Sequence, residues 1–250
     1  LRSKYAAQSR LPFYTGEGGL NQNRWQKGVK PMGPQLAARG TRDQIWMSVC
    51  SGADGCLYWT LGLDLEAQEF ASVRPALDAL GLDLPTLKRQ RPSAALALPP
   101  GARDRRDVVL AMRLLDLGAD FDTVSTNEAS AYAVRLVPGE HQPESLDLPA
   151  TVARPAPGWQ IATLVSDTGD RALLYLRNVA GGVKDFGAPP RPCHLRDVRP
   201  AEAAFTLRET WRAVTVFDLD ARQARTVQPD ASGRVTFGTT DHDFLIGLRR

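Results

Sequence analysis

A carboxylate surrounded by glycines is the feature of this sequence with the clearest chemical potential. It lies in LPFYTGEGGLNQNRW, positions 11–25, where an apolar start predicts a short strand over 11–15 and Glu17 follows the end of that strand. Glycines on both sides would let a ligand approach the carboxylate without side-chain clashes. Two amides and an indole follow in the same stretch: Asn21, Asn23 and Trp25. Such groups suit the polar edges and the C–H face of a polyhydroxylated ring, and the alternative is an ordinary solvated carboxylate beside a flexible turn.

The elements that follow predict how Glu17 would be positioned. PQLAARGTRDQIWMSVCSG reads as a helix, because Ala38, Ile45, Trp46, Val49 and Cys50 form one apolar face. DGCLYWT predicts a buried strand, and SVRPALDALG predicts a second helix with Ser72 as N-cap and Pro75 in its first turn. Strand, helix, strand, helix is the repeat of a parallel α/β unit. In an α/β barrel the reactive groups lie where strands end, so we expect parallel neighbours at 11–15 and 56–60 with Glu17 and Trp59 on one rim.

The rest of the chain predicts two further units. A small unit of the βαβ type is predicted from four stretches: AALAL, DRRDVVLAMRLLDLG, DFDTV and YAVRLV. After them come short alternating strands separated by the turns DTGD, AGG and DASG, and these predict a β-sandwich. The predicted fold class is therefore α/β plus β. We expect the end of a (β/α)8 barrel in residues 1–90, a small α/β domain in 91–148 and a C-terminal β-sandwich in 149–250.

The composition and motifs argue against several classes of partner and cofactor. Its 31 basic and 28 acidic residues are interspersed and form no basic stripe, which argues against a nucleic-acid partner. No apolar run reaches the roughly 18 residues of a membrane helix, so no membrane span is predicted. PPGARD lacks the dinucleotide fingerprint and no cofactor is predicted. No metal site is predicted either, because Asp241, His242 and Asp243 in TTDHDF read as a turn into the last strand. The cellular compartment and a homo-oligomeric state stay open.

Several of these motifs resemble the last two barrel strands of the family 42 glycoside hydrolases, which are retaining β-galactosidases of clan A. Glu17 matches the nucleophile of that family, Asn23 and Trp25 approximate its Asn–Trp element, and SGADGCLYW matches the run into its eighth strand. Glu69 with Phe70 matches a later glutamate element. The resemblance implies that Glu17 is the catalytic nucleophile and that five residues shape the sugar subsite: Asn21, Asn23, Trp25, Trp59 and Glu69.

The resemblance also implies a reaction and a limit. Retaining glycosidases use two carboxylates about 5 to 5.5 Å apart, one as nucleophile and one as acid/base. In the family the acid/base ends strand four, which corresponds to a position upstream of residue 1. We therefore expect a retaining exo-glycosidase that hydrolyses β-linked sugars of an oligosaccharide or glycoside, whose present chain alone is inactive.

Departures from the family pattern keep two alternatives open. Arg24 separates Asn23 from Trp25, Thr60 occupies the place of an Arg–Trp pair, and Ala71 replaces a sugar-contacting histidine. One alternative is a non-catalytic carbohydrate-binding or scaffolding protein that has kept the barrel architecture. The other is that the C-terminal β-domain is the functional part, as an adhesion or sugar-binding module.

Overall fold

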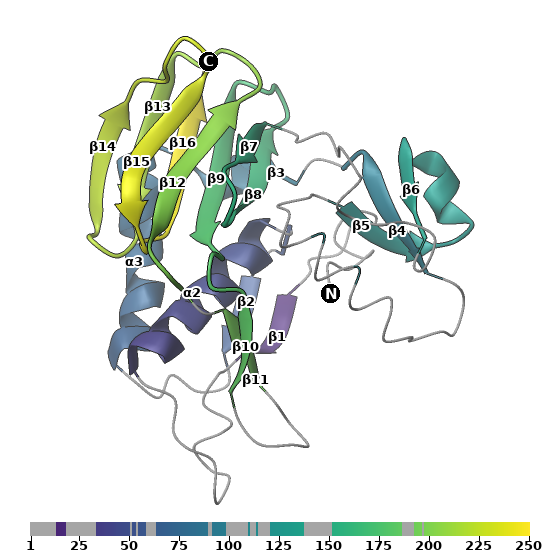
Figure 1. Ribbon diagram of the computed structural model, residues 1–250, viewed down its shortest axis with the longest axis horizontal. Helices are drawn as coiled ribbons and strands as arrows, with labels where there is room; N and C mark the ends of the chain where they lie inside the picture. Colours follow the sequence, from purple (N-terminus) through teal and green to yellow (C-terminus); the bar gives the residue numbers. More distant parts are fainter. Residues whose placement is uncertain are drawn as a thin grey trace, which may run out of the picture.

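The computed structural model describes residues 14–18, 34–50, 52–53, 55–58, 64–89, 92–98, 110, 114, 121–137, 152–186, 193–196 and 198–250. Four residues predicted to shape the sugar subsite lie outside these ranges: Asn21, Asn23, Trp25 and Trp59. The described elements form a two-stranded parallel sheet with two helices, a separate small parallel unit, and a β-sandwich (Figure 1).

The first unit has the predicted strand–helix–strand–helix order. Strands β1 (Tyr14–Gly18) and β2 (Gly55–Tyr58) are parallel neighbours, which confirms the predicted pairing. Helix α2 (Pro34–Cys50) connects them and helix α3 (Asp64–Leu80) follows. Strand β1 includes Glu17, which the sequence had placed beyond the strand. Two parallel strands with their helices are the repeat that a barrel needs, and the complete barrel stays a prediction.

Helix α3 differs from its predicted start. It begins at Asp64, so Ser72 is an interior residue and Pro75 lies inside the helix. The Ser72 hydroxyl donates a hydrogen bond of 2.7 Å to the carbonyl of Glu69 in the preceding turn and caps nothing. The helix tolerates the hydrogen bond lost at Pro75 because its apolar face, including Ala76, Leu77 and Leu80, is buried against the rest of the protein.

The small middle unit, for which the sequence predicted a βαβ type, contains a three-stranded parallel sheet. Its order is β5–β4–β6, formed by Phe121–Ser125, Ala94–Leu98 and Val134–Leu136. A 3-10 helix, η3 (Glu128–Ala131), precedes β6. Most of the helix predicted before β5 lies outside the described residues, and its Leu110 and Leu114 are helical and buried in the core of this unit.

The C-terminal region consists of two β-sheets packed face to face as in a β-sandwich, and one strand of the larger sheet comes from residues 87–88, outside the predicted range 149–250. One sheet has the order β15–β12–β7 and the other has the order β14–β13–β16–β9–β8–β3. The first sheet consists of Arg234–Thr240, Ala201–Leu207 and Ala153–Pro155. The second consists of Gln223–Val227, Ala213–Asp218, Phe244–Arg249, Arg171–Asn178, Trp159–Ser166 and Leu87–Lys88. A 3-10 helix, η2 (Leu84–Thr86), leads into β3, and β10 (Val183–Phe186) with β11 (Cys193–Arg196) forms a hairpin of its own.

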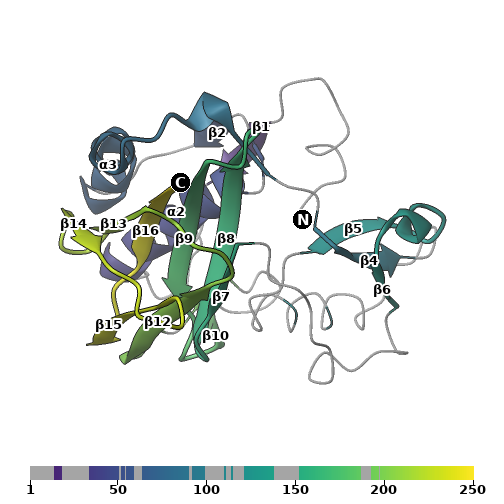
Figure 2. The ribbon, with the colours of Figure 1, turned by 90° about the horizontal axis from the view of Figure 1, so that it is seen from above.

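The six-stranded sheet is covered on both faces. One face packs against the three-stranded sheet β15–β12–β7 through a core that contains Trp159, Phe205 and Phe244. The other face packs against α2 and α3 through a second core that contains Trp46 and Tyr175. Figure 2 shows the helices and the three-stranded sheet on opposite sides of this central sheet. The helices that follow β1 and β2 are therefore packed onto the sandwich.

The helices of the described part of the chain include none that is both long and apolar enough to cross a membrane.

Candidate active site at the junction of helices and sandwich

The carboxyl ends of β1 and β2 lie at one edge of their sheet. Gly18, the last residue of β1, is in register with Tyr58, the last residue of β2. Glu17 directly precedes Gly18, and Trp59 directly follows Tyr58 in the sequence. A helix that follows a parallel strand runs back along it, so the first turns of α2 and α3 start from this same edge. The site predicted around Glu17 is thus topologically connected to the N-terminal halves of the two helices.

A pocket of about 590 Å³ lies between those helix halves and the sandwich. Helix α2 contributes Arg39 and Arg42, helix α3 contributes Gln68 and Glu69, and the turn between β13 and β14 contributes Asp220. Its volume is in the range of small-molecule sites in proteins. Glu69 is the predicted subsite residue that the structure places in this pocket.

Arg42 holds the pocket's acidic side chains in place. Its Nε donates to Glu69 Oε2 at 2.9 Å and its Nη2 donates to Glu69 Oε1 at 3.0 Å, which is a bidentate pair between α2 and α3. Its Nη1 donates to Asp220 Oδ2 at 2.8 Å and to Asp243 Oδ2 at 3.4 Å, both in the sandwich. The Arg42 side chain is only 4% exposed. One guanidinium therefore ties both helices to the sandwich.

The charge balance around Arg42 keeps it protonated. Burial by itself would lower the pKa of Arg42, but the hydrogen bond to Glu69 and the charges of Asp243 and Asp220 outweigh burial and hold that pKa above its usual range. Asp243 is fully buried and also accepts the backbone N–H of Asn178 at 2.9 Å. Buried charges of this kind persist only when they are paired and hydrogen-bonded.

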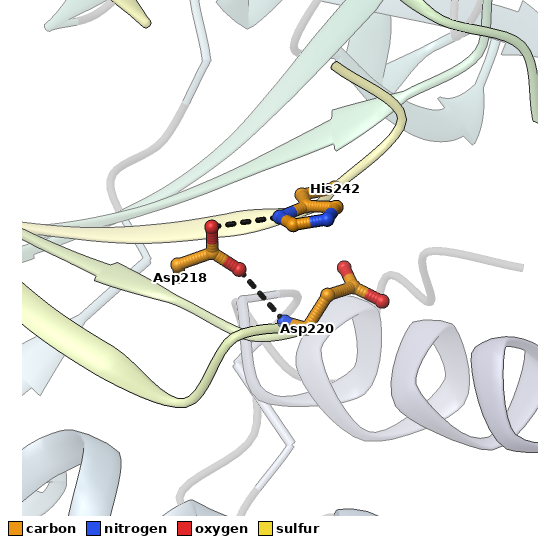
Figure 3. Close-up of side chains that lie close together, drawn as sticks. All are labelled: Asp218, Asp220 and His242. Atoms are coloured by element: carbon orange, nitrogen blue, oxygen red, sulfur yellow. Dashed lines mark hydrogen bonds and ion pairs between the residues drawn. The ribbon is translucent and has the colours of Figure 1, made fainter.

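A second cluster consists of Asp218, Asp220 and His242 (Figure 3), and it shares Asp220 with the Arg42 network. The ring nitrogen Nδ1 of His242 lies 2.8 Å from Asp218 Oδ2, and Asp218 Oδ1 accepts the backbone N–H of Asp220 at 2.9 Å. Burial lowers the pKa of His242, but the hydrogen bond and charge of Asp218, together with Asp220 and Asp241, raise it overall. Next to it, Arg39 Nη2 donates to Asp241 Oδ2 at 3.0 Å, and this bond lowers the pKa of Asp241.

The second cluster also has the residue types of a metal site. Asp218, Asp220 and His242 offer ligand atoms within 4.8 Å of one another. However, Asp220 Oδ2 already accepts from the Arg42 guanidinium and from the backbone N–H of Asp243 at 2.9 Å. A divalent cation there would lie beside a guanidinium and would have to displace these bonds. The geometry is that of an ion-pair network.

The structure thus qualifies and extends the sequence-based site. Glu69 lines the pocket, but it is 5% exposed and both of its oxygens are bonded to Arg42. Glu17 lies in β1, and its side chain is outside what the structure describes. Arg42 was not predicted, although it carried a signal: it occupies the same helix face as Ala38, Ile45 and Trp46, where a charge requires a buried partner.

A comparison with solved structures found a chain with a similar fold. Protein-family models gave no match, and neither did curated protein sequences. The fold is similar to that of α-L-fucosidase isoenzyme 2 from Paenibacillus thiaminolyticus, with a TM-score of 0.52 at 10% identity, over 90% of this chain and 58% of that one. At this identity the similarity establishes the fold alone, and the chain spans less than two thirds of that enzyme.

A second solved structure is a GH27 β-L-arabinopyranosidase from Geobacillus stearothermophilus. It matches at 10% identity over 86% of this chain and 62% of that one, with a TM-score of 0.22 that is too low to carry an argument.

Proposed function

We propose that this chain belongs to a retaining exo-glycosidase in which Glu17 is the nucleophile. The observation that carries the proposal is the fold similarity, over 90% of the chain, to a solved α-L-fucosidase. It is supported by the parallel pair β1–β2, whose shared carboxyl edge is where barrel enzymes hold their reactive groups. The motif resemblance around Glu17 points to the same reaction class.

In this proposal the Glu17 carboxylate attacks the anomeric carbon as the leaving group departs. A covalent glycosyl–enzyme forms, and water then hydrolyses it with retention of configuration. By the family resemblance, the acid/base that protonates the leaving group would end the fourth strand of the barrel. Glu69 would accept hydrogen bonds from sugar hydroxyls, because each of its oxygens keeps a lone pair beside the bond from Arg42.

The sugar has to be found by experiment. The motif resemblance favours a β-linked galactoside, whereas the solved structure with the similar fold is named for α-L-fucose. A panel of nitrophenyl glycosides that includes β-D-galactoside, β-L-arabinopyranoside and α-L-fucoside would identify the substrate on the full-length protein.

The decisive variant is Glu17→Gln, measured on whichever glycoside of the panel is turned over. Gln keeps the shape of the side chain but cannot form the glycosyl–enzyme bond, so kcat should fall by roughly three orders of magnitude or more, which is about 4 kcal/mol. Asp167→Asn, in the exposed turn between β8 and β9, is the matched control and should leave kcat unchanged. Near wild-type turnover of the Glu17 variant would end the assignment.

The second candidate is a non-catalytic carbohydrate-binding protein. Ala71 favours it, because it replaces the sugar-contacting histidine of the resembled family, and Thr60 stands where that family usually has an Arg–Trp pair. In that case no glycoside of the panel would be turned over, and Glu17→Gln would leave sugar affinity nearly unchanged.

A further inference from the structure

The hydrogen-bonding groups that remain available in the pocket are mainly donors. The charges of the pocket's two acids are balanced by a guanidinium, since Glu69 and Asp220 both pair with Arg42. Arg222, in the turn that leads into β14, donates to Gln68 Oε1 at 3.3 Å, and no carboxylate of the described residues lies within ion-pair distance of it. The Gln68 side-chain NH2 group therefore keeps both of its donors, and it lines the same pocket.

Helix α2 adds further donors. Arg39 uses Nη2 for Asp241 and Asp220, and among the described residues its other guanidinium nitrogens make no hydrogen bond. Gln35, in the first turn of α2, also lines the pocket, and this turn contains no acidic residue. The positive end of the helix dipole is therefore not neutralised from within the helix.

These groups fit one chemical class of ligand. Two guanidiniums and two amides that line one pocket can donate to an oxyanion, and charge-assisted bonds from guanidinium to an anionic oxygen are among the strongest hydrogen bonds in proteins. Apolar side chains of Leu65 and Val198, both partly exposed, line the pocket beside them and would contact the C–H groups of a larger ligand. A bare inorganic ion would leave that apolar surface without a partner.

We propose that this pocket binds the acidic group of a negatively charged saccharide, with Arg222 and Arg39 as the recognising residues. The oxyanion is a carboxylate, as in a uronic acid, or a sulfate ester. The saccharide part of this proposal rests on the proposed glycosidase function, which it deepens by naming a substrate class.

Calorimetric titration of the full-length protein tests the proposal. The probes are digalacturonate, its neutral dimethyl ester, a sulfated galactobiose and inorganic sulfate. Digalacturonate or the sulfated disaccharide should bind, the dimethyl ester should bind at least about tenfold more weakly, and added salt should weaken binding of the charged probe. Of the two acidic disaccharides, the one that binds more tightly identifies the acidic group.

Single substitutions locate the site. Arg222→Gln and Arg39→Gln should each weaken binding of the acidic disaccharide about tenfold, the loss expected for one charge-assisted hydrogen bond. Arg171→Gln is the matched control, since Arg171 is half-exposed and lies at the opposite end of the central sheet from Asp218. Arg222 is exposed, so its variant should fold, and an unchanged melting temperature would verify this.

Three results would overturn the proposal: equal affinity for the dimethyl ester, inorganic sulfate bound as tightly as the acidic disaccharides, or affinity unchanged in both arginine variants. Binding is measured in Glu17→Gln protein as well as in wild type, which separates the two proposals. If the Glu17→Gln variant loses turnover but neither protein binds the acidic disaccharides, the inference about this pocket is wrong and the proposed glycosidase function stands. If the Glu17→Gln variant retains turnover and still binds the acidic disaccharides, the proposed role of Glu17 is wrong and the inference about this pocket stands.

Discussion

Arg42 shows how a single side chain can connect three parts of this protein. It lies in α2, pairs with Glu69 in α3, and reaches Asp220 and Asp243 in the sandwich. Removing a guanidinium from such a site leaves several buried carboxylates without a countercharge, which costs more than the pair itself contributes. The stability of the pocket wall therefore depends on this residue.

Arg42→Met should lower the free energy of unfolding by about 3–5 kcal/mol, because Met fills the volume but removes the guanidinium that is bonded to both oxygens of the buried Glu69 carboxylate. Chemical denaturation followed by circular dichroism would measure the change. Arg39→Met is the control and should cost about 1 kcal/mol or less, because its partner Asp241 is 43% exposed and solvent screens the pair. Equal losses in the two variants would contradict the network described above.

His242 predicts a specific pH dependence. Its pKa is raised above the ordinary value of 6.5 in the folded protein, so the protonated ring favours folding. This stabilisation is fully present below about pH 6.5 and is lost as the pH rises through the higher folded pKa. It should amount to less than about 1 kcal/mol, because the side chain is 38% exposed.

The comparison is between wild type and His242→Asn, with the free energy of unfolding measured from pH 5 to pH 9. The difference between the two proteins should shrink as the pH rises. A difference that stays constant, or that grows with pH, would show that the His242–Asp218 contact does not stabilise the charged ring.

At the residue scale, the sequence offers candidate residues but does not indicate their partners. Glu17 could be singled out because its neighbours in the sequence are glycines. The partners of Glu69 could not, since Arg42, Asp220 and Asp243 are far from it along the chain and come together only when the helices pack on the sandwich.

At the scale of elements, the contact between α3 and β16 depends on the absence of a side chain. A Cβ at Gly247 would lie 3.1 Å from the Leu80 Cβ and 3.4 Å from the Leu80 carbonyl oxygen. The main chain of β16 can therefore approach the helix closely only because residue 247 is glycine.

Gly247→Val should destabilise the protein by roughly 1–3 kcal/mol or more, the cost of overpacking a filled core. Thr215→Val is a matched control, because Thr215 is in register with Gly247 on the neighbouring strand and is only half-buried. Thermal unfolding of the two variants would compare them. A valine at 247 that is tolerated as well as one at 215 would mean that α3 and β16 are farther apart than described.

The predictability of the elements follows from their local signals. Strands β8 and β9 were predicted with their observed bounds, because runs of apolar residues end at a tight DTGD turn. Strands β12 and β14 were not predicted. The first contains AEAA, residues with helical preference, and the second is largely exposed with no apolar alternation. In both, pairing with neighbouring strands decides the conformation.

At the scale of the molecule, the central sheet belongs to two cores at once. Tyr175 and Leu245 face α2 and α3, whereas Leu174 and Ile246 on the same strands face the three-stranded sheet. The middle unit has its own smaller cores around Leu96 and Ala97. Helices and sandwich should therefore unfold together, and the middle unit should be able to open separately.

Native-state hydrogen exchange with mass spectrometry would test this coupling. Amides of α2, α3, β9 and β16 should share one free energy of opening, and those of β4 should open with a lower one. Exchange in α2 and α3 that is much faster than in β9 would show that the helices are not part of the sandwich's cooperative unit.

The most direct measurement of the central claim is covalent labelling of the nucleophile. The full-length protein is incubated with 2-deoxy-2-fluoro glycosyl fluorides of the panel sugars and digested, and the labelled peptide is sequenced by mass spectrometry. We predict one labelled site, on the Glu17 carboxylate, with loss of activity in proportion to labelling and none in the Glu17→Gln variant. A label on any other carboxylate, or full inactivation with Glu17 unmodified, would contradict the assignment.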